Sequence, residues 1–533
     1  MKYSVQTNKI FGKDWLQYHP YDNTTSIDNY YLWLCNDVLK IILQSEIAEY
    51  LNNSNEEKKL ACVLVSYFED VISETRLFST FTRLHKQMYG KELPFYKISD
   101  DYYDDEVNVH DIYFLIWYQI SVFNEDIVID PCFENSEAFL DGVSKIYDLF
   151  DNEFEKAPQN ERLQKYLQLS SGSSDMKVVR EKFEFIVCKS FFYNSFFERY
   201  YQKKLDKYKK NDIVVLDKKT ELEIYDQKIH FYYNEYMPLL SLRVNEYFAE
   251  VLGEENSEYQ FIKNISKRIF GSFLIRKIKS DGFLIEHLTS KKQIWLSNEF
   301  TSLQRVKLVE NETVLTLGLV CWKDDVWQNQ GGCIVNTLTE LKGKDISKNL
   351  FDDENQKLET IRQLEKAFLE LTDGKQMVYC RGKREYSEFH LQLMRKHAKI
   401  AEPNITDHEL NETYENMIDK IESDLPFEDD ETTGIFFNSN GGLEVYREGV
   451  ISCMKDKNNP YYTHGEFDLC DLITIDTFSK EFINYIIEND LMNLCVNDYK
   501  NPDMFKIIME NLDFLLRFFR RTEYFSKPRI TTE

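Results

Sequence analysis

The sequence predicts a mainly α, multidomain α+β protein with a small central β-barrel or bent-sheet unit. Only 18 Gly and 10 Pro occur in 533 residues, which disfavours a turn-rich all-β fold. Aromatic residues make up 15% of the chain, a content that indicates large packed cores. Near residue 270 the spacing of hydrophobic residues changes from a period near 3.6 to a period of 2, which separates a helical part from a β part.

Helices are predicted over most of the first 200 residues. Hydrophobic side chains recur at helical spacing in four segments, 57–89, 110–120, 137–157 and 180–208. Gly90 and Pro94 should end the first of these segments. Glu69 and Asp70 lie within it, and we interpret them as hydrogen-bonded acids at a tertiary contact, because the Glu-x-x-His pairs of a carboxylate-bridged dimetal site are missing from the chain.

The central part of the chain alternates between apolar and polar residues, as strands do. Five short strands are expected at 272–278, 283–288, 293–296, 313–322 and 326–329. Asp281-Gly282 suits a tight turn, and Gly331-Gly332 permits a bend or bulge. Five strands in about 65 residues predict a small barrel or a strongly bent sheet.

Composition and hydrophobic spacing divide the chain into six predicted segments. These are a helical N-terminal domain (1–205), a helical connector (206–267), the small β unit (268–340), a helical segment (341–400), an acidic linker (401–433) and a C-terminal α+β unit (434–533). The linker is predicted because 402–431 holds twelve acidic residues and the single base Lys420, with few large apolar side chains. Further elements are expected as helices at 355–371, 478–489 and 502–521 and strands at 434–437 and 443–446.

Charge and cysteine usage limit the classes of partner and compartment. The formal charge is −26, so nucleic acid and membrane are not expected partners, and nucleic-acid binding would need a locally basic face. Proteins are the expected partners. The ten cysteines form no CxxC pair, and the chain begins without an apolar leader segment, so we expect a reducing cytoplasm.

Familiar catalytic and cofactor motifs are missing from the sequence. No GxxxxGK[ST] or GxGxxG loop occurs, and we expect neither a cofactor nor a metal. His390 and His397 are seven residues apart and are interpreted as surface histidines, because metal ligands on one helix are usually four apart. Cys380 lies beside Arg381 and Lys383, which could lower a thiol pKa, although a structural cysteine at a strand end is the simpler interpretation.

A basic island could contact nucleic acid. Its members are Lys203, Lys204, Lys207, Lys209 and Lys210, with tyrosines between them. The alternative is a helix C-terminus at which lysines complement the macrodipole.

Two tryptophans near a turn form the most distinctive motif outside the N-terminal domain. Trp322 and Trp327 flank Asp324-Asp325, and Asn329 and two glycines follow. They could pack as a cross-strand pair, or Trp322, Trp327 and Asn329 could line a site for a small polar molecule.

Several ordered blocks of residues along most of the chain carry a family resemblance. The densest blocks lie in 67–118 and are Phe68-Glu69-Asp70, Tyr89-Gly90-Lys91, Leu93-Pro94-Phe95-Tyr96 and Phe114-Leu115-Ile116-Trp117. The others include Lys13-Asp14-Trp15, His19-Pro20-Tyr21, Asp28, Asn160, Trp327–Gly331, Asn459-Pro460-Tyr461 and Asn511-Leu512-Asp513-Phe514-Leu515. Together these blocks resemble an uncharacterised Bacteroidota family known only as a domain of unknown function. The resemblance implies no activity, cofactor or site residue, because none is established for the family.

The leading hypothesis is a non-catalytic binding or scaffold protein. It depends on the missing motifs and on the abundance of Tyr and Phe, which are favoured at the centres of interfaces. One alternative is an enzyme with an unrecognised site near the central β unit. Another is a nucleic-acid-associated protein that uses the Lys203–Lys210 island.

Overall fold

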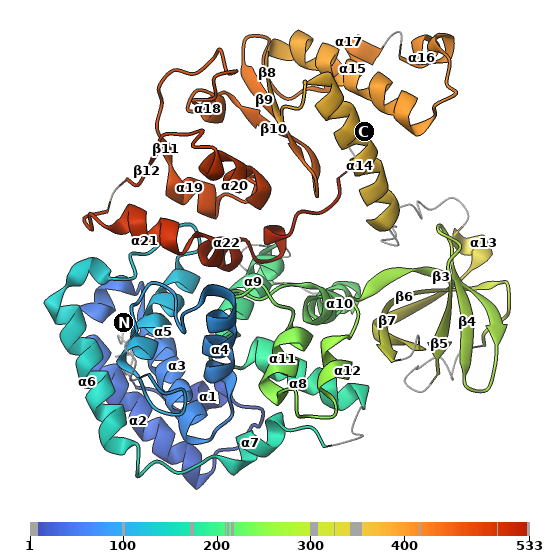
Figure 1. Ribbon diagram of the computed structural model, residues 1–533. Helices are drawn as coiled ribbons and strands as arrows, with labels where there is room; N and C mark the ends of the chain where they lie inside the picture. The colour runs from blue at the N-terminus through green and yellow to red at the C-terminus, as the bar shows by residue number, and fades with distance from the viewer. Residues whose placement is uncertain are drawn as a thin grey trace. The chain divides into compact units, whose positions relative to one another are not determined.

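The computed structural model divides into two compact units (Figure 1). It describes residues 9–98, 102–170, 175–207, 209–210, 213–214, 218–298, 307–323, 326–341, 354–414, 417–497 and 499–529. The first unit contains residues 1–351 and 513–522, and the second contains residues 352–512 and 523–533. The fold is mainly α with a bent-sheet unit, which confirms the predicted fold class.

Helices form the N-terminal part of the first unit. Their bounds are α1 (Gly12–Trp15), α2 (Ser26–Leu43), α3 (Ser54–Ile72), α4 (Leu77–Tyr89), α5 (Val109–Phe123), α6 (Glu137–Glu153), α7 (Glu161–Leu167), α8 (Met176–Cys188), α9 (Asn194–Asp206), α10 (Lys218–Asn234), α11 (Val244–Leu252) and α12 (Tyr259–Lys263). The short strands β1 (Lys209–Lys210) and β2 (Ile213–Val214) pair between α9 and α10.

The segment 57–89, predicted as one helix, forms the two helices α3 and α4. Glu74 and Arg76 between them have left-handed backbones, with φ of 51° and 64°. The Asp70 carboxylate accepts hydrogen bonds from the amides of Leu77 (2.9 Å) and Phe78 (2.8 Å), so it caps α4 from the end of α3. The capping side chain belongs to the preceding helix and not to the N-cap position of α4, so the sequence just before α4 gives no sign of a helix start. The predicted stop at Gly90 is confirmed.

A buried polar network joins the segment between α1 and α2, α2 itself, α3 and the start of α7. His19 Nε2 lies 2.8 Å from Glu69 Oε2, and Asn160 Nδ2 donates to Glu69 Oε1 at 2.8 Å. The Asn160 amide also donates to the hydroxyl of Tyr21, which in turn donates to Asp28. These polar side chains are buried, and their hydrogen bonds offset the cost of removing them from water. The interpretation of Glu69 and Asp70 as acids at tertiary contacts is therefore confirmed.

The last long helix of the chain packs in the core of this first unit. Helix α22 (Leu512–Arg520) carries Phe514, which is 1% exposed and lies 5.7 Å from the Phe95 ring and 6.0 Å from the Trp117 ring. Phe518 lies 5.2 Å from Trp117. Tyr89 Oη donates to Asp513 at 2.7 Å. Thus residues near the C-terminus complete the N-terminal aromatic core.

Residues 269–337 form a strongly bent sheet that we call the β unit. Its strands are β3 (Ile269–Ile278), β4 (Gly282–His287), β5 (Gln293–Ser297), β6 (Thr313–Lys323) and β7 (Val326–Thr337), followed by helix α13 (Leu338–Leu341). All five predicted strands are present, and β7 is longer than expected because it continues past Gly331-Gly332, where its register with β6 shifts. Its interior is apolar and contains Phe273, Ile275, Phe283, Ile285, Ile294, Leu296, Leu315, Leu317 and Leu319.

The strands of the β unit pair in the order β3-β4-β5-β7-β6, and β6 returns to β3. All pairs are antiparallel except β5 with β7, which meet in parallel at the single pair Leu296–Trp327. A first strand that pairs with the second and fourth, and a third that runs parallel to the fifth, give the strand order of the OB-fold.

One side of the β unit is attached to the helices. Arg268 is buried, forms an ion pair with Asp226 of α10, and donates from Nε to the backbone oxygen of Gln330 at 2.7 Å. A Cβ at Gly318 would lie 2.0 Å from the Arg268 guanidinium, so glycine makes room for this contact. Strands β6 and β7 are therefore the strands next to the helices, as Figure 1 shows.

The second unit contains a three-stranded antiparallel sheet and helices. The sheet order is β10-β9-β8. The elements are α14 (Glu354–Leu371), β8 (Met377–Arg381), α15 (Gly382–Ala401), α16 (Asp407–Tyr414), α17 (Met417–Asp424), β9 (Thr432–Asn438), β10 (Gly442–Arg447), α18 (Glu448–Ile451), β11 (Phe467–Asp468), α19 (Leu469–Thr474), α20 (Lys480–Glu488), β12 (Leu494–Cys495) and α21 (Met504–Glu510).

Residues 401–433, predicted as an acidic linker, contain helical segments in the structure. These helices are α16 and α17, and the segment lies within the second unit. Leu410 and Phe427 are buried, and Arg384 lies 3.3 Å from Glu422. A few buried apolar residues and ion pairs with neighbouring elements thus hold a segment whose composition alone resembles a linker.

Candidate functional site

Trp322 and Trp327, predicted as a cross-strand pair or as part of a ligand site, lie on opposite sides of the sheet. The residue opposite Trp327 on β6 is Cys321. Trp327 packs against the apolar interior of the β unit. Trp322 is 7% exposed and packs edge-on against Phe261 of α12, with 4.9 Å between ring centroids. Cys321 and Trp327 point to the same face of the sheet, and Trp322, the next residue after Cys321, points to the other face. The two tryptophans therefore do not pack against each other.

Asn329, the third predicted ligand-binding residue, lies farther along β7. Its Nδ2 donates to the backbone oxygen of Gly331 at 3.4 Å, and its buried Oδ1 has no hydrogen-bond partner among the described residues. Because Trp322 faces the helices and Trp327 the interior of the sheet, the three predicted residues do not form one surface.

A different row of side chains lies on the outside of β3, β4 and β5. Ile294 and Leu296 point into the apolar interior, so Trp295 between them points outward. Trp295 is opposite Leu284 on β4, and Leu284 is opposite Lys277 on β3. Lys277 is exposed, whereas Leu284 and Trp295 are half-buried. A cation, an aliphatic group and an indole therefore lie side by side across three strands.

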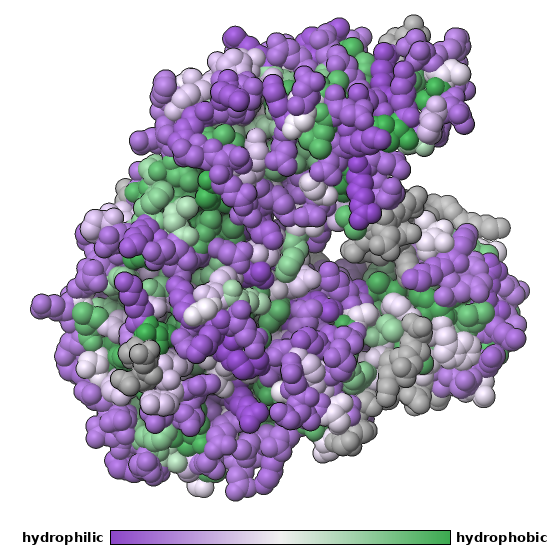
Figure 2. Space-filling view, viewed as in Figure 1, coloured by the Kyte–Doolittle hydropathy of each residue, from purple (hydrophilic) through white to green (hydrophobic). Residues whose placement is uncertain are grey.

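Further charged groups surround this row. The exposed Lys279 places its ammonium 5.1 Å from the centre of the Trp295 ring. Arg276 donates to Glu286 at 2.7 Å, and this hydrogen bond lowers the pKa of Glu286 to about 2. We call the surface formed by Lys277, Lys279, Leu284 and Trp295 the outer face. On the β unit, Figure 2 shows hydrophilic side chains interleaved with hydrophobic ones.

The sequence around the outer face is basic, although the chain is acidic. Residues 268–298 hold six Lys and Arg against two Asp and Glu, a balance of +4, whereas the whole chain carries −26. A local charge count would have found this stretch. The basic residues of this stretch are separated by apolar strand residues, so they do not form a compact run like that of the Lys203–Lys210 island.

The Lys203–Lys210 island is divided by the fold. Lys203, Lys204 and Lys207 lie at the end of α9, and Lys209 and Lys210 form β1, where their side chains lie outside the described part of the structure. Lys203 forms an ion pair with Glu125, and Lys204 lies 5.1 Å from the Tyr200 ring. Near a helix C-terminus these contacts fit the macrodipole interpretation.

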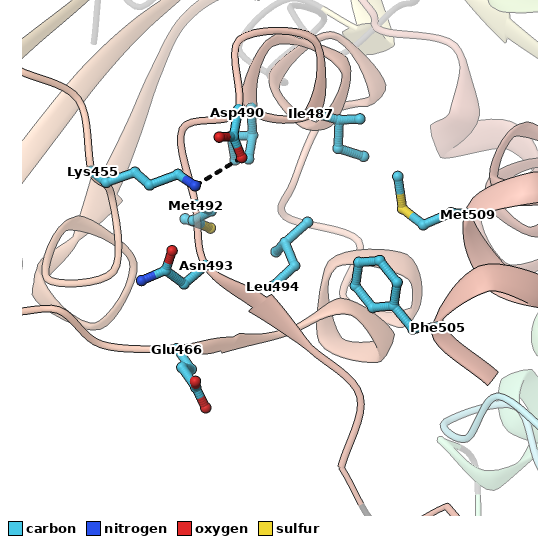
Figure 3. A pocket seen from close by; sticks show the side chains of 10 residues that line it. Lys455, Glu466, Ile487, Asp490, Met492, Asn493, Leu494, Phe505 and Met509 are labelled. Atoms are coloured by element: carbon cyan, nitrogen blue, oxygen red, sulfur yellow. Dashed lines mark hydrogen bonds and ion pairs between the residues drawn. The ribbon is translucent and has the colours of Figure 1, made fainter. Parts of the chain in front are cut away.

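In the second unit, a pocket of about 410 Å³ lies beside α20 and α21 (Figure 3). Apolar side chains, among them Leu494, Phe505 and Met509, form one wall. Lys455 and Asp490 form a 2.8 Å ion pair at the pocket, and the same pair borders a neighbouring hollow of about 850 Å³. Glu466 and Asn493 also line the pocket, so its lining is partly polar and partly apolar.

Cys380, His390 and His397, the residues considered for thiol or metal chemistry, are largely shielded from solvent. Burial raises the pKa of Cys380 to about 12, the opposite of activation. Burial also lowers the pKa values of His390 and His397, and His390 stacks on Tyr386 with 6.0 Å between ring centroids. Within the described ranges, no three His, Cys, Asp or Glu side chains are grouped as metal ligands. The helices described there include none that is long and apolar enough to cross a membrane.

Comparison with known proteins defines the class of this chain. The fold is a mainly helical protein with an attached bent sheet, and the model of a family described as protein of unknown function (DUF3843) matches residues 9–274, about half of the chain. The chain belongs to this family. The match covers the helical domain, including His19, Glu69 and Asn160, and ends within β3. No curated protein and no solved structure matches the chain significantly.

Proposed function

We propose that the protein is a non-catalytic binding protein whose outer face on the β unit takes up a negatively charged ligand. The observation that carries this proposal is the row Lys277–Leu284–Trp295 with Lys279 beside it, in a locally basic part of an acidic chain. A basic face of this kind is what the overall charge of −26 requires before an anionic ligand can bind.

The chemistry of the outer face favours binding over catalysis. Lysines supply long, mobile cations, and Leu284 and Trp295 supply apolar contact area. An enzyme would need a nucleophile or an acid and a base held within hydrogen-bonding distance. We also propose a cytoplasmic location. The ten cysteines, all free thiols, are compatible with a reducing compartment.

The test is the binding of two labelled anionic polymers, heparin and a single-stranded oligonucleotide, followed by fluorescence anisotropy at low and moderate salt. The double variant Lys277→Glu/Lys279→Glu should weaken binding at least about tenfold and reduce the slope of log affinity against log salt for the oligonucleotide by about 1.4. The matched control is Lys13→Glu/Lys177→Glu, which makes the same charge change at two exposed lysines of the helical domain.

The control should bind almost as the unmodified protein does. Equal losses in the two double variants would mean that net charge, and not the outer face, governs binding, and this would contradict the proposal. Failure of the unmodified protein to bind either polymer at low salt would contradict it as well.

A further inference from the structure

Trp295 is held in place on the surface of the sheet. A Cβ built at Gly282 would lie 2.4 Å from the backbone oxygen of Leu296 and 2.9 Å from Cζ2 of the indole, so glycine is required here and the ring lies against the backbone of β4. Trp295 is half-buried by this contact and by its neighbours. A ring whose position is fixed before a ligand arrives loses little entropy on binding.

The cations of the outer face lie beside this ring. Lys279 places its ammonium 5.1 Å from the ring centre, and Lys277 lies in the same row two strands away. Strands are spaced about 4.8 Å apart, so Lys277 and Trp295 are about 10 Å apart along the row. A polymer that lies across the strands would meet a cation, an apolar group and an aromatic ring in turn.

A ligand that uses all of these groups must carry both charge and flat rings. We infer that this ligand is single-stranded nucleic acid, with one base stacked on Trp295 and neighbouring phosphates on Lys277 and Lys279. The inference rests on the proposed function and specifies its ligand. Single strands present unstacked bases together with their phosphates, and proteins bind them by combining a basic groove with aromatic stacking.

The topology of the β unit agrees with this ligand by fold-level analogy. The order β3-β4-β5-β7-β6 is that of an OB-fold, in which the face of the second and third strands binds oligonucleotides or oligosaccharides. Here these strands are β4 and β5, which carry Leu284 and Trp295. The basic residues favour the charged polymer over a neutral sugar.

The test compares a single-stranded oligonucleotide, the corresponding duplex and heparin on the full-length protein. The single strand should bind more tightly than the duplex and should quench tryptophan fluorescence. Trp295→Ala should lower affinity for the single strand roughly 5- to 150-fold, the usual effect of losing one stacked base. Trp295→Phe should retain most of the affinity, because it keeps an aromatic face.

Trp33→Phe is the matched control, since Trp33 is 48% exposed on α2 in the helical domain. It should leave affinity and the quenching by ligand unchanged. Trp295→Ala should also leave heparin binding unchanged, because heparin has no bases. If duplex or heparin binds as tightly as the single strand and Trp295→Ala has no effect, the stacking inference is overturned while the proposed function stands. If none of the three binds, both are overturned.

Discussion

The buried network around His19 and the outer face of the β unit make opposite use of polar residues. In the network, His19, Glu69 and Asn160 are at most 2% exposed, and they bond to one another. On the outer face, Lys277 and Lys279 are exposed. His19, Glu69 and Asn160 belong to blocks by which the sequence resembles its family and lie within the matched residues 9–274, whereas all four residues of the outer face lie beyond residue 274. In these two regions, the recognisable motif accompanies a buried structural network, and the surface that we propose for the ligand lies outside the matched residues.

The comparison predicts its largest effect at Glu69. Glu69→Ala removes the partner of His19 and an acceptor of Asn160, and breaking a buried ion pair should cost about 3–5 kcal/mol of unfolding free energy. Chemical denaturation measures this loss. The control Glu161→Ala breaks the exposed ion pair with Lys165 and should leave the unfolding free energy nearly unchanged. Similar small losses in both variants would remove the structural distinction between network and surface.

A slightly smaller effect is expected in the aromatic core that α22 completes. Phe514→Ala should lower stability by about 3 kcal/mol, because the side chain is 1% exposed and packs against five aromatic rings. Phe505→Ala on α21 is the control, since Phe505 is 40% exposed, and it should lower stability much less than Phe514→Ala does. A Phe514 variant as stable as the control would contradict the packing of α22 in the first unit.

The pH dependence of stability should be comparable in magnitude and should depend on one identified group. Burial raises the pKa of Asp111 to about 7, against the hydrogen bonds from Tyr67 and Asn108 that favour its charged form. The folded state therefore holds this proton where the unfolded chain has lost it, so the stability contributed by Asp111 is present below about pH 4 and is lost as pH rises towards 7.

Asp111→Asn should remove this contribution, roughly 2–4 kcal/mol between pH 4 and pH 7. Urea denaturation at several pH values measures it. His19 should continue to contribute in the variant: burial by itself would lower its pKa, but Glu69 raises it above its ordinary value, so that contribution is present below about pH 6.5 and is lost as pH rises further. An unchanged pH profile in Asp111→Asn would show that Asp111 is not the group responsible.

Local patterns predicted the elements of this fold better than their endings and partners. The strands of the β unit followed from alternation, and Gly90 correctly marked the end of α4. The break before α4 was missed because its cap, Asp70, comes from another helix. The packing of 401–433 was missed because two buried residues, Leu410 and Phe427, hold a segment that composition describes as a linker.

The candidate surface was harder to predict than the fold. Alternation along β5 predicts that Trp295 points to one face of the sheet and that Ile294 and Leu296 point to the other. It does not predict which face packs on helices. That choice depends on Arg268, which reaches Asp226 and Gln330 through the space left by Gly318. Two tryptophans were predicted as candidates for the ligand site. Trp322 faces the helices and Trp327 faces the interior of the β unit, whereas Trp295 lies on the outer face of β3, β4 and β5.

The most direct test of the central claim, that the outer face is the binding surface, is photocrosslinking followed by peptide mapping. A single-stranded oligonucleotide containing 5-bromodeoxyuridine is irradiated with the full-length protein, and the crosslinked residues are located by mass spectrometry. We expect the main crosslink at Trp295 or within residues 277–298, lost in Lys277→Glu/Lys279→Glu and retained in Lys13→Glu/Lys177→Glu. Crosslinks concentrated at Lys203–Lys210 or in the second unit, with residues 277–298 unmodified, would contradict the account.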